Sequence, residues 1–271
     1  MVRGDRVTER DPVIARDSDV PLARRLLAAA AVVWSAVPVL MLVLRARDAA
    51  WPWPRLVPQP AGASDAVPVT ALFAPLATGV VLAVATALVV VPVAFVLAWR
   101  IRRLPPRRQG AALLAAFVPV VLPPVTLGIG VQLVALRTGL AGTSMGVLFA
   151  HVVPALGYAV LALVAALRDD DGRAEEAART LGASWWTVAR RVTVPRHATA
   201  LVAAGVLAAL VSWGQVATTL LVGEGAVRTL AVEVLAVVRS GDDRRAAWAA
   251  LLLTVPPLAA LLLAMRRRSA S

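Results

Sequence analysis

Long apolar stretches separated by short arginine-rich segments dominate the pattern of this chain. A bilayer core about 30 Å thick needs roughly 20 helical residues at about 1.5 Å each, and six stretches reach that length. They are residues 26–44, 70–99, 111–136, 144–167, 199–222 and 246–265. The pattern therefore predicts an all-α, polytopic membrane protein with six transmembrane helices.

The arginines indicate how these helices are oriented. With the N-terminus in the cytoplasm, 20 of the 28 arginines fall in cytoplasmic segments and 8 in external ones, as the positive-inside rule requires. We therefore expect both termini to be cytoplasmic, with a loose tail at 1–25, a transmembrane domain at 26–265 and a short tail at 266–271. A secretory signal peptide at the start is the alternative, but the first apolar stretch is longer than a signal-peptide core of about 7–15 residues.

Composition excludes several other classes of protein. The chain has 271 residues, a net charge of +12 and only 16% charged residues, against about 25% in an ordinary soluble domain. It has no Cys, which excludes a disulfide scaffold, and no Lys, which excludes a P-loop of its own. The basic residues lie between apolar runs rather than along one face of a domain, so they indicate loops at a cell membrane and not a nucleic-acid-binding surface.

The one sizeable cytoplasmic loop, residues 168–198, carries the most specific pattern in the chain. An Ala-rich segment after a run of Asp favours a short helix. Gly182 allows the left-handed geometry that ends a helix, Ser184 is a good N-cap for a second helix, and Pro195 limits the length of that second helix. The loop is therefore predicted to form two short helices joined at Gly182.

This loop resembles the coupling loop of the permease subunits of binding-protein-dependent ABC importers, whose pattern is E-A-A-x-x-x-G-x9-I-x-L-P. The spacing is kept, with Val in place of Ile and of Leu. The matching residues are Glu176, Ala177, Ala178, Gly182, Val192, Val194 and Pro195. The resemblance implies the fold of a type I importer permease. It also implies that Glu176 pairs with a basic group of a separate ATPase, that the two alanines keep the docking face flat, and that Gly182 sets the angle between the helices.

The resemblance extends over roughly residues 70–265 and implies a set of partners. Segments 119–130, 139–143, 151–158 and 212–221 are similar to permeases of the polyamine, ferric-iron and thiamine branch, although Gln215 stands where such permeases often carry an acidic residue. The implied complex contains an ABC ATPase, a second permease subunit (identical or a sister chain) and an extracytoplasmic solute-binding protein. The chain itself is then a transport subunit in the lipid bilayer, without enzymatic activity, bound cofactor or metal.

Neutral polar side chains are the candidates for lining a translocation pathway, because no Asp, Glu or Arg lies well inside a predicted span. That absence argues against a proton-coupled carrier. The candidates are Gln132, His151, Tyr158, Ser212, Gln215, Thr218 and Thr219. The alternative role for each is hydrogen bonding between helices. The alternative for the whole chain is an ATP-independent secondary transporter or channel.

The segment after the fifth apolar stretch, residues 223–245, is predicted to be external. Glu233 is expected on a short helix together with Val232, Leu235 and Val238. This helix could form the gate that meets the binding protein, or it could lie at the membrane surface as an amphipathic helix. The sequence leaves both roles open.

Overall fold

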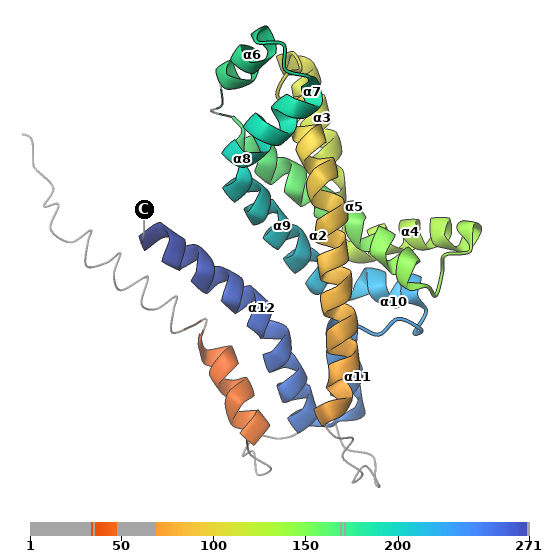
Figure 1. Ribbon diagram of the computed structural model, residues 1–271. Coiled ribbons are helices and arrows are strands. Elements are labelled where there is room, and N and C mark those ends of the chain that lie inside the picture. The colour runs from red at the N-terminus through yellow and green to blue at the C-terminus, as the bar shows by residue number, and fades with distance from the viewer. Residues whose placement is uncertain (1–33, 35, 48–68, 169, 171, 270–271) are drawn as a thin grey trace, which may run out of the picture.

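The structure, a computed structural model, describes residues 34, 36–47, 69–168, 170 and 172–269. Every regular element among these residues is a helix, which confirms the all-α prediction for this part of the chain (Figure 1). The predicted tail 1–25 and residues 26–33 and 35 of the first predicted span, 26–44, lie outside the described residues. Residues 36–47 are helical.

Three helices form the centre of the molecule: α2 (Phe73–Ile101), α5 (Ser144–Ala166) and α9 (Ala198–Trp213), which pack side by side (Figure 1). Along each of these three helices, small residues recur about every fourth position. This spacing puts them on one face of the helix and lets the backbones approach closely. The buried contact includes Val90, Ala94 and Ala98 of α2, Ala155, Ala159 and Leu163 of α5, and Ala204 and Ala208 of α9.

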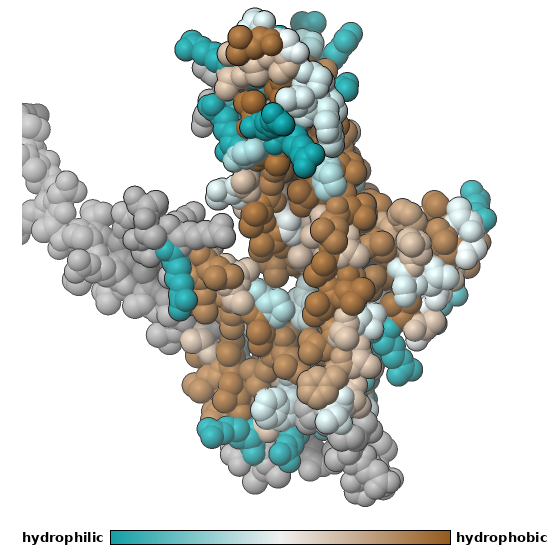
Figure 2. All heavy atoms as spheres, viewed as in Figure 1, coloured by the Kyte–Doolittle hydropathy of each residue, from teal (hydrophilic) through white to brown (hydrophobic). Residues whose placement is uncertain are grey.

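The outer surface of this bundle is apolar. Val81 and Leu88 on α2 are 66% and 71% exposed, and many other large hydrophobic side chains are exposed as well. Figure 2 shows hydrophobic side chains over the middle of the molecule and hydrophilic ones toward its extremities. A continuous apolar surface of this size is stable in lipid or against another chain, not in water. The described helices therefore form the body of an integral membrane protein.

The third predicted span, 111–136, is not one straight helix. The structure has α3 (Pro106–Val121) and α4 (Pro124–Thr138), whose axes differ by 98°. The cause is the Pro123-Pro124 pair, because a residue that precedes proline is driven to extended backbone angles. Leu122 has ψ 135° and Pro123 has ψ 134°, so two successive residues leave the helical region. The predicted stretch 111–136 is thus helical on both sides of a sharp bend.

The fifth predicted span, 199–222, is also interrupted. α9 ends at Trp213 and α10 (Ala217–Gly223) begins at Ala217, leaving a break of three residues at 214–216. Gly214 stands at the C-cap of α9, where its lack of a side chain weakens the helix. By length and composition, the described residues hold three helices able to cross a membrane, or up to five if each bent pair is one span. The number six and the orientation stay predictions.

The last two helices form a hairpin, and the first of them packs against α2 near the end where α2 begins (Figure 1). α11 (Leu230–Ser240) is the short helix expected around Glu233, and α12 runs over Asp243–Ser269. An ion pair of 3.2 Å between Glu233 and Arg245 joins the two helices. Within α12, Pro256 and Pro257 lack the N–H groups that would bond the carbonyls four residues earlier. The Trp213 Nε1–H donates to one of these carbonyls, that of Leu253, at 2.8 Å.

Candidate functional site

The loop at residues 168–198 is called the elbow below, and its residues 172–198 form a bent helical segment at one end of the bundle (Figure 1). α6 (Arg173–Thr180) is followed by Gly182 at φ +82°, in the left-handed region that favours glycine. α7 (Trp185–Val188) starts the second helical part. The predicted pair of short helices on either side of Gly182 is thus present in the structure.

The second helical part of the elbow contains α7, a π-helical turn at Ala189–Thr193 and α8 (Val194–Arg196). The Ser184 Oγ accepts a hydrogen bond from the Thr187 backbone N–H at 3.3 Å, so Ser184 caps this part as expected. The wide π turn lies directly before Pro195, which has no N–H to donate. The helix ends one residue after Pro195, and the chain bends by 79° into α9.

The only buried side chain of α6 is a carboxylate, that of Glu175, which is 3% exposed. Its Oε1 accepts hydrogen bonds from Trp99 Nε1 at 3.0 Å and from Arg102 at 2.8 Å. Its Oε2 pairs with Arg103. The hydroxyl of Thr193, in the π turn, donates to Oε1 at 3.0 Å. One carboxylate therefore joins α6 to the last turn of α2 and to the second part of the elbow.

A second buried carboxylate, Asp170, completes this ion-pair cluster. Its Oδ2 lies 2.7 Å from His197 Nε2 and 3.3 Å from Arg102, and its Oδ1 accepts the Gly172 N–H at 3.1 Å. Burial opposes ionisation of Asp170. The hydrogen bonds from Gly172 and His197 and the charges of Arg102 and Arg196 outweigh that effect and lower the pKa of Asp170. The side chain is therefore ionised at neutral pH.

The same balance holds for Glu175. Burial by itself would raise the pKa of Glu175, but hydrogen bonds from Trp99 and Thr193 and the charges of Arg102 and Arg103 lower it below the ordinary value. Sequence reasoning missed this cluster. The available signal was a Glu-Glu pair on a short helix, whose side chains point about 100° apart, and an Arg-Arg pair at the end of an apolar span.

The other face of α6 is exposed and carries the residue that the sequence singled out. Glu176 is exposed, because successive helix positions point about 100° apart and Glu175 points inward. Leu181 is 89% exposed and Trp186 is 64% exposed. The other residues of the coupling-loop pattern are exposed or half-buried. Ala177 and Pro195 are exposed, Val194 is 38% exposed, and Ala178 and Val192 are half-buried. Leu181 and Trp186 are therefore large apolar side chains that the described residues leave mostly uncovered.

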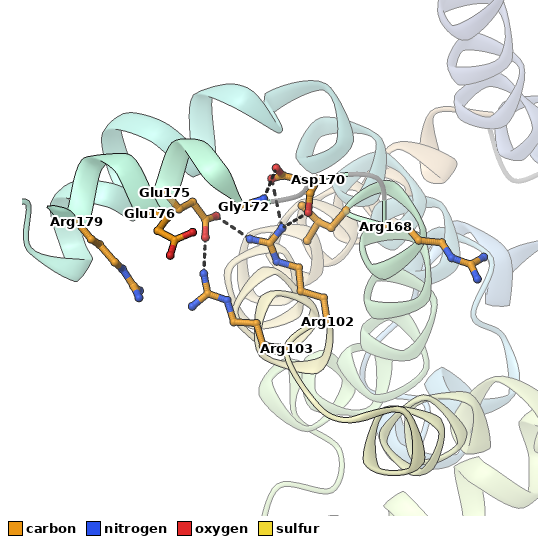
Figure 3. Close-up of a pocket in the computed structure, with 9 residues that line it drawn as sticks. Arg102, Arg103, Arg168, Asp170, Gly172, Glu175, Glu176 and Arg179 are labelled. Atoms are coloured by element: carbon orange, nitrogen blue, oxygen red, sulfur yellow. Dashed lines mark hydrogen bonds and ion pairs between the residues drawn. The ribbon is translucent and has the colours of Figure 1, made fainter. Parts of the chain in front are cut away.

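An open, charged pocket of about 400 Å³ lies between α6 and the ends of α2 and α5 (Figure 3). Figure 3 shows the side chains of Glu176 and Arg179 reaching from α6 and those of Arg102 and Arg103 reaching from α2, while Arg168 points away from the ion pairs. The pocket is therefore a recess between the exposed edge of α6 and the ion-pair cluster, with four arginines in its lining.

A second group of polar side chains, called the buried polar cluster below, lies inside the bundle. His151 on α5 is fully buried, with Nδ1 2.8 Å from Ser212 Oγ and Nε2 2.9 Å from Thr219 Oγ1. Thr86 of α2 donates to Ser212 at 3.2 Å, and Thr219 donates to the Gln215 carbonyl at 2.7 Å. Every donor in this series of hydrogen bonds has an acceptor when the imidazole of His151 is neutral and carries its proton on Nε2.

Five of the seven predicted pathway residues gather at the break between α9 and α10. Besides His151, Ser212 and Thr219, they include Gln215 in the break itself and Thr218, which donates to the Gln215 side chain at 2.9 Å. The other two, Gln132 and Tyr158, contribute no hydrogen bond to this cluster among the described residues; Gln132 is half-buried and Tyr158 is 38% exposed. A pathway role for each of the seven stays a prediction.

Comparison with known proteins agrees with this arrangement. A family model described as binding-protein-dependent transport system inner membrane component matches residues 90–269. The chain therefore belongs to this family of ABC importer permeases. Its relatives include the molybdenum transport system permease protein ModB of Mycobacterium bovis and that of Mycobacterium tuberculosis. Each is 32% identical over 235 residues, which cover 80% of this chain and 83% of the relative.

The match confirms the resemblance at the level of the family, and it identifies the chain as a permease component. The relatives are named for molybdenum, so they give no support to the polyamine, ferric-iron and thiamine branch that the span sequences suggested. The coupling residues, the partners and the expectation of no cofactor stay predictions.

Proposed function

We propose that this chain is the permease subunit of an ATP-driven importer and that the elbow docks into a separate ATPase subunit. The observation that carries this proposal is the exposure of Glu176, Leu181 and Trp186 on the elbow, while Glu175 is ion-paired to the bundle. An apolar side chain beside an acidic one suits a protein interface with an apolar centre and a charged rim. A basic group of the ATPase would pair with Glu176.

The proposed mechanism is a population shift. ATP binding closes two ATPase subunits, the docked elbows move with them, and the permease changes from inward-facing to outward-facing, which admits solute from an external binding protein. The scheme needs two permease chains, identical or sister, each with its elbow in the cytoplasm. Both termini of this multi-pass chain then lie on the cytoplasmic side of the cell membrane, as the distribution of arginines favours.

The cargo that we propose is a tetrahedral oxyanion of the molybdate type. Two relatives at 32% identity are named for molybdenum transport. At the α9–α10 break, the Gln215 side chain carries amide N–H groups that can donate hydrogen bonds to an oxyanion, while its carbonyl oxygen accepts from Thr218. No Asp or Glu occurs in α2, α5, α9 or α10, so these helices offer no counter-charge to a cation.

The coupling proposal is tested by co-purification with the ATPase and by solute uptake. Glu176→Lys reverses the docking charge, and Gly182→Val puts a β-branched residue at φ +82°, a conformation that it adopts only with strain. We expect both variants to reach the membrane, with ATPase retention and uptake lowered at least about tenfold. Arg137→Gln, on α4, is the matched control and should behave as the wild type. Uptake that survives both substitutions, or that persists without the ATPase, would overturn the proposal.

The cargo proposal has a separate test. Uptake of labelled molybdate by membranes that contain the complete transporter should be inhibited by unlabelled tungstate, which has the same charge and shape, and not by spermidine or ferric iron. Inhibition by a cation, with no effect of tungstate, would contradict an oxyanion cargo and leave the coupling proposal intact.

A further inference from the structure

We propose that Glu175 is a positioning residue that fastens the elbow to α2, so that displacement of the elbow by an ATPase is transmitted to α2 and from there to the broken span. This inference rests on the coupling role proposed above. It assigns different tasks to two adjacent glutamates: Glu176 faces the partner, and Glu175 holds the elbow to the bundle.

The attachment of α6 to the bundle depends on this carboxylate. Glu175 is the only residue of α6 that is buried, so no apolar side chain of that helix anchors it. Both carboxylate oxygens are engaged by the last turn of α2, through Trp99, Arg102 and Arg103. The half-buried Ala174 and Ala178 add only a small apolar area, so the ion pairs and hydrogen bonds of Glu175 contribute most to where α6 lies relative to α2.

The contacts around Glu175 also restrict how the elbow can move. The guanidinium of Arg102 bridges Glu175 and Asp170, which precedes α6, and Thr193 ties the same carboxylate to the second part of the elbow. Arg103 stacks over the Trp99 ring at 3.7 Å. Glu175 is buried, Arg102 and Asp170 are half-buried, and Arg103 is exposed. Sliding α6 along α2 would therefore leave the carboxylate of Glu175 unpaired and out of water. The elbow and the end of α2 are therefore expected to move together.

A continuous helix then links this attachment to the buried polar cluster. Trp99 and Thr86 are both on α2, about 20 Å apart at about 1.5 Å per residue. Thr86 donates to Ser212, the residue that also contacts His151 beside the α9–α10 break. A shift of α2 thus acts directly on the hydrogen bonds that hold the two halves of the broken span.

The decisive experiment compares Glu175→Gln with Glu176→Gln in the complete transporter reconstituted in lipid vesicles. Three quantities are measured: retention of the ATPase on the permease, the rate of ATP hydrolysis, and the solute transported per ATP hydrolysed. Glu175→Gln keeps the size of the side chain and can still accept hydrogen bonds from Trp99 and Thr193, but it removes the charge. We expect it to retain the ATPase and to hydrolyse ATP, while solute transported per ATP falls about tenfold. Glu176→Gln is expected instead to lower ATPase retention.

Trp99→Phe keeps the aromatic ring and removes one hydrogen bond to Glu175, so it is the milder second variant in case Glu175→Gln does not accumulate in the membrane. It should lower transport per ATP by a smaller factor with the ATPase still bound. Normal transport per ATP in both variants would overturn the inference. Loss of ATPase binding by Glu175→Gln, to the extent seen for Glu176→Gln, would also overturn it. If the wild-type permease binds no ATPase at all, the proposed function itself fails.

Discussion

The elbow and the buried polar cluster both join separate helices through polar side chains, but they use different chemistry. In the elbow, two carboxylates pair with arginines at the end of the bundle, next to an open pocket. In the buried polar cluster, an imidazole and hydroxyl groups form neutral hydrogen bonds between apolar helices. The difference follows from solvation, because an ion inside an apolar bundle is expensive unless it is fully paired.

This difference determines how each region responds when one of its polar side chains is removed by substitution. Removing one partner of a buried ion pair leaves the other charge without compensation. Removing one member of a neutral network leaves groups that can bond elsewhere: Ser212 keeps Thr86, and Thr219 keeps the Gln215 carbonyl. We therefore expect the elbow to be the more sensitive of the two regions to a single substitution.

The largest effect is expected for Glu175→Ala, which leaves Arg102 buried without its closest carboxylate. The free energy of opening the elbow should fall by about 3 kcal/mol, the lower end of the range for a broken buried ion pair. Hydrogen exchange of residues 173–196 in lipid nanodiscs measures this change. The control is Glu176→Ala, whose exposed carboxylate should contribute less than about 0.5 kcal/mol. Equal effects of the two substitutions would show that burial of Glu175 does not matter for the elbow.

A smaller effect on the stability of the elbow is expected when the pH is lowered. The pKa values of Asp170 and Glu175 lie below their ordinary values of 3.8 and 4.5, so these groups contribute stability that is fully present above the ordinary values and is lost as the pH falls through the lowered ones. The elbow should stay closed from pH 7 to about 5 and should loosen below about 4. Hydrogen exchange corrected for its intrinsic pH dependence tests this. In the Glu175→Gln variant, the hydrogen exchange of the elbow should depend less on pH. An unchanged pH profile would show that other groups cause the dependence.

The smallest effect is expected in the buried polar cluster. His151→Ala should lower the free energy of unfolding by about 1–2 kcal/mol, since two neutral hydrogen bonds are lost: the Ser212 hydroxyl loses its acceptor, while the Thr219 hydroxyl keeps the Gln215 carbonyl. Thermal unfolding in detergent, followed by size-exclusion chromatography, measures the change. Tyr158→Phe is the matched control on the same helix. A loss larger than that of Glu175→Ala would reverse the comparison between the two regions.

Local signals made the shape of the elbow predictable. A glycine at the required left-handed position, a serine cap and a proline near the end all act within a few residues, so Gly182, Ser184 and Pro195 could be assigned from sequence. The break at Pro123-Pro124 has an equally local cause, because a residue before proline takes up extended backbone angles. That local rule places the break but does not give the angle of 98° between the two helices.

The sequence by itself determined that the chain is helical, that it is apolar enough for a membrane, and that it carries a coupling-loop pattern, because these properties depend on composition and on short spacings. Only the tertiary structure decided which of two adjacent glutamates is buried and which polar side chains meet at the α9–α10 break. Trp99, Arg102 and Arg103 reach Glu175 across more than 70 positions of the chain. Contacts over such separations arise from the packing of helices, and no local pattern specifies them.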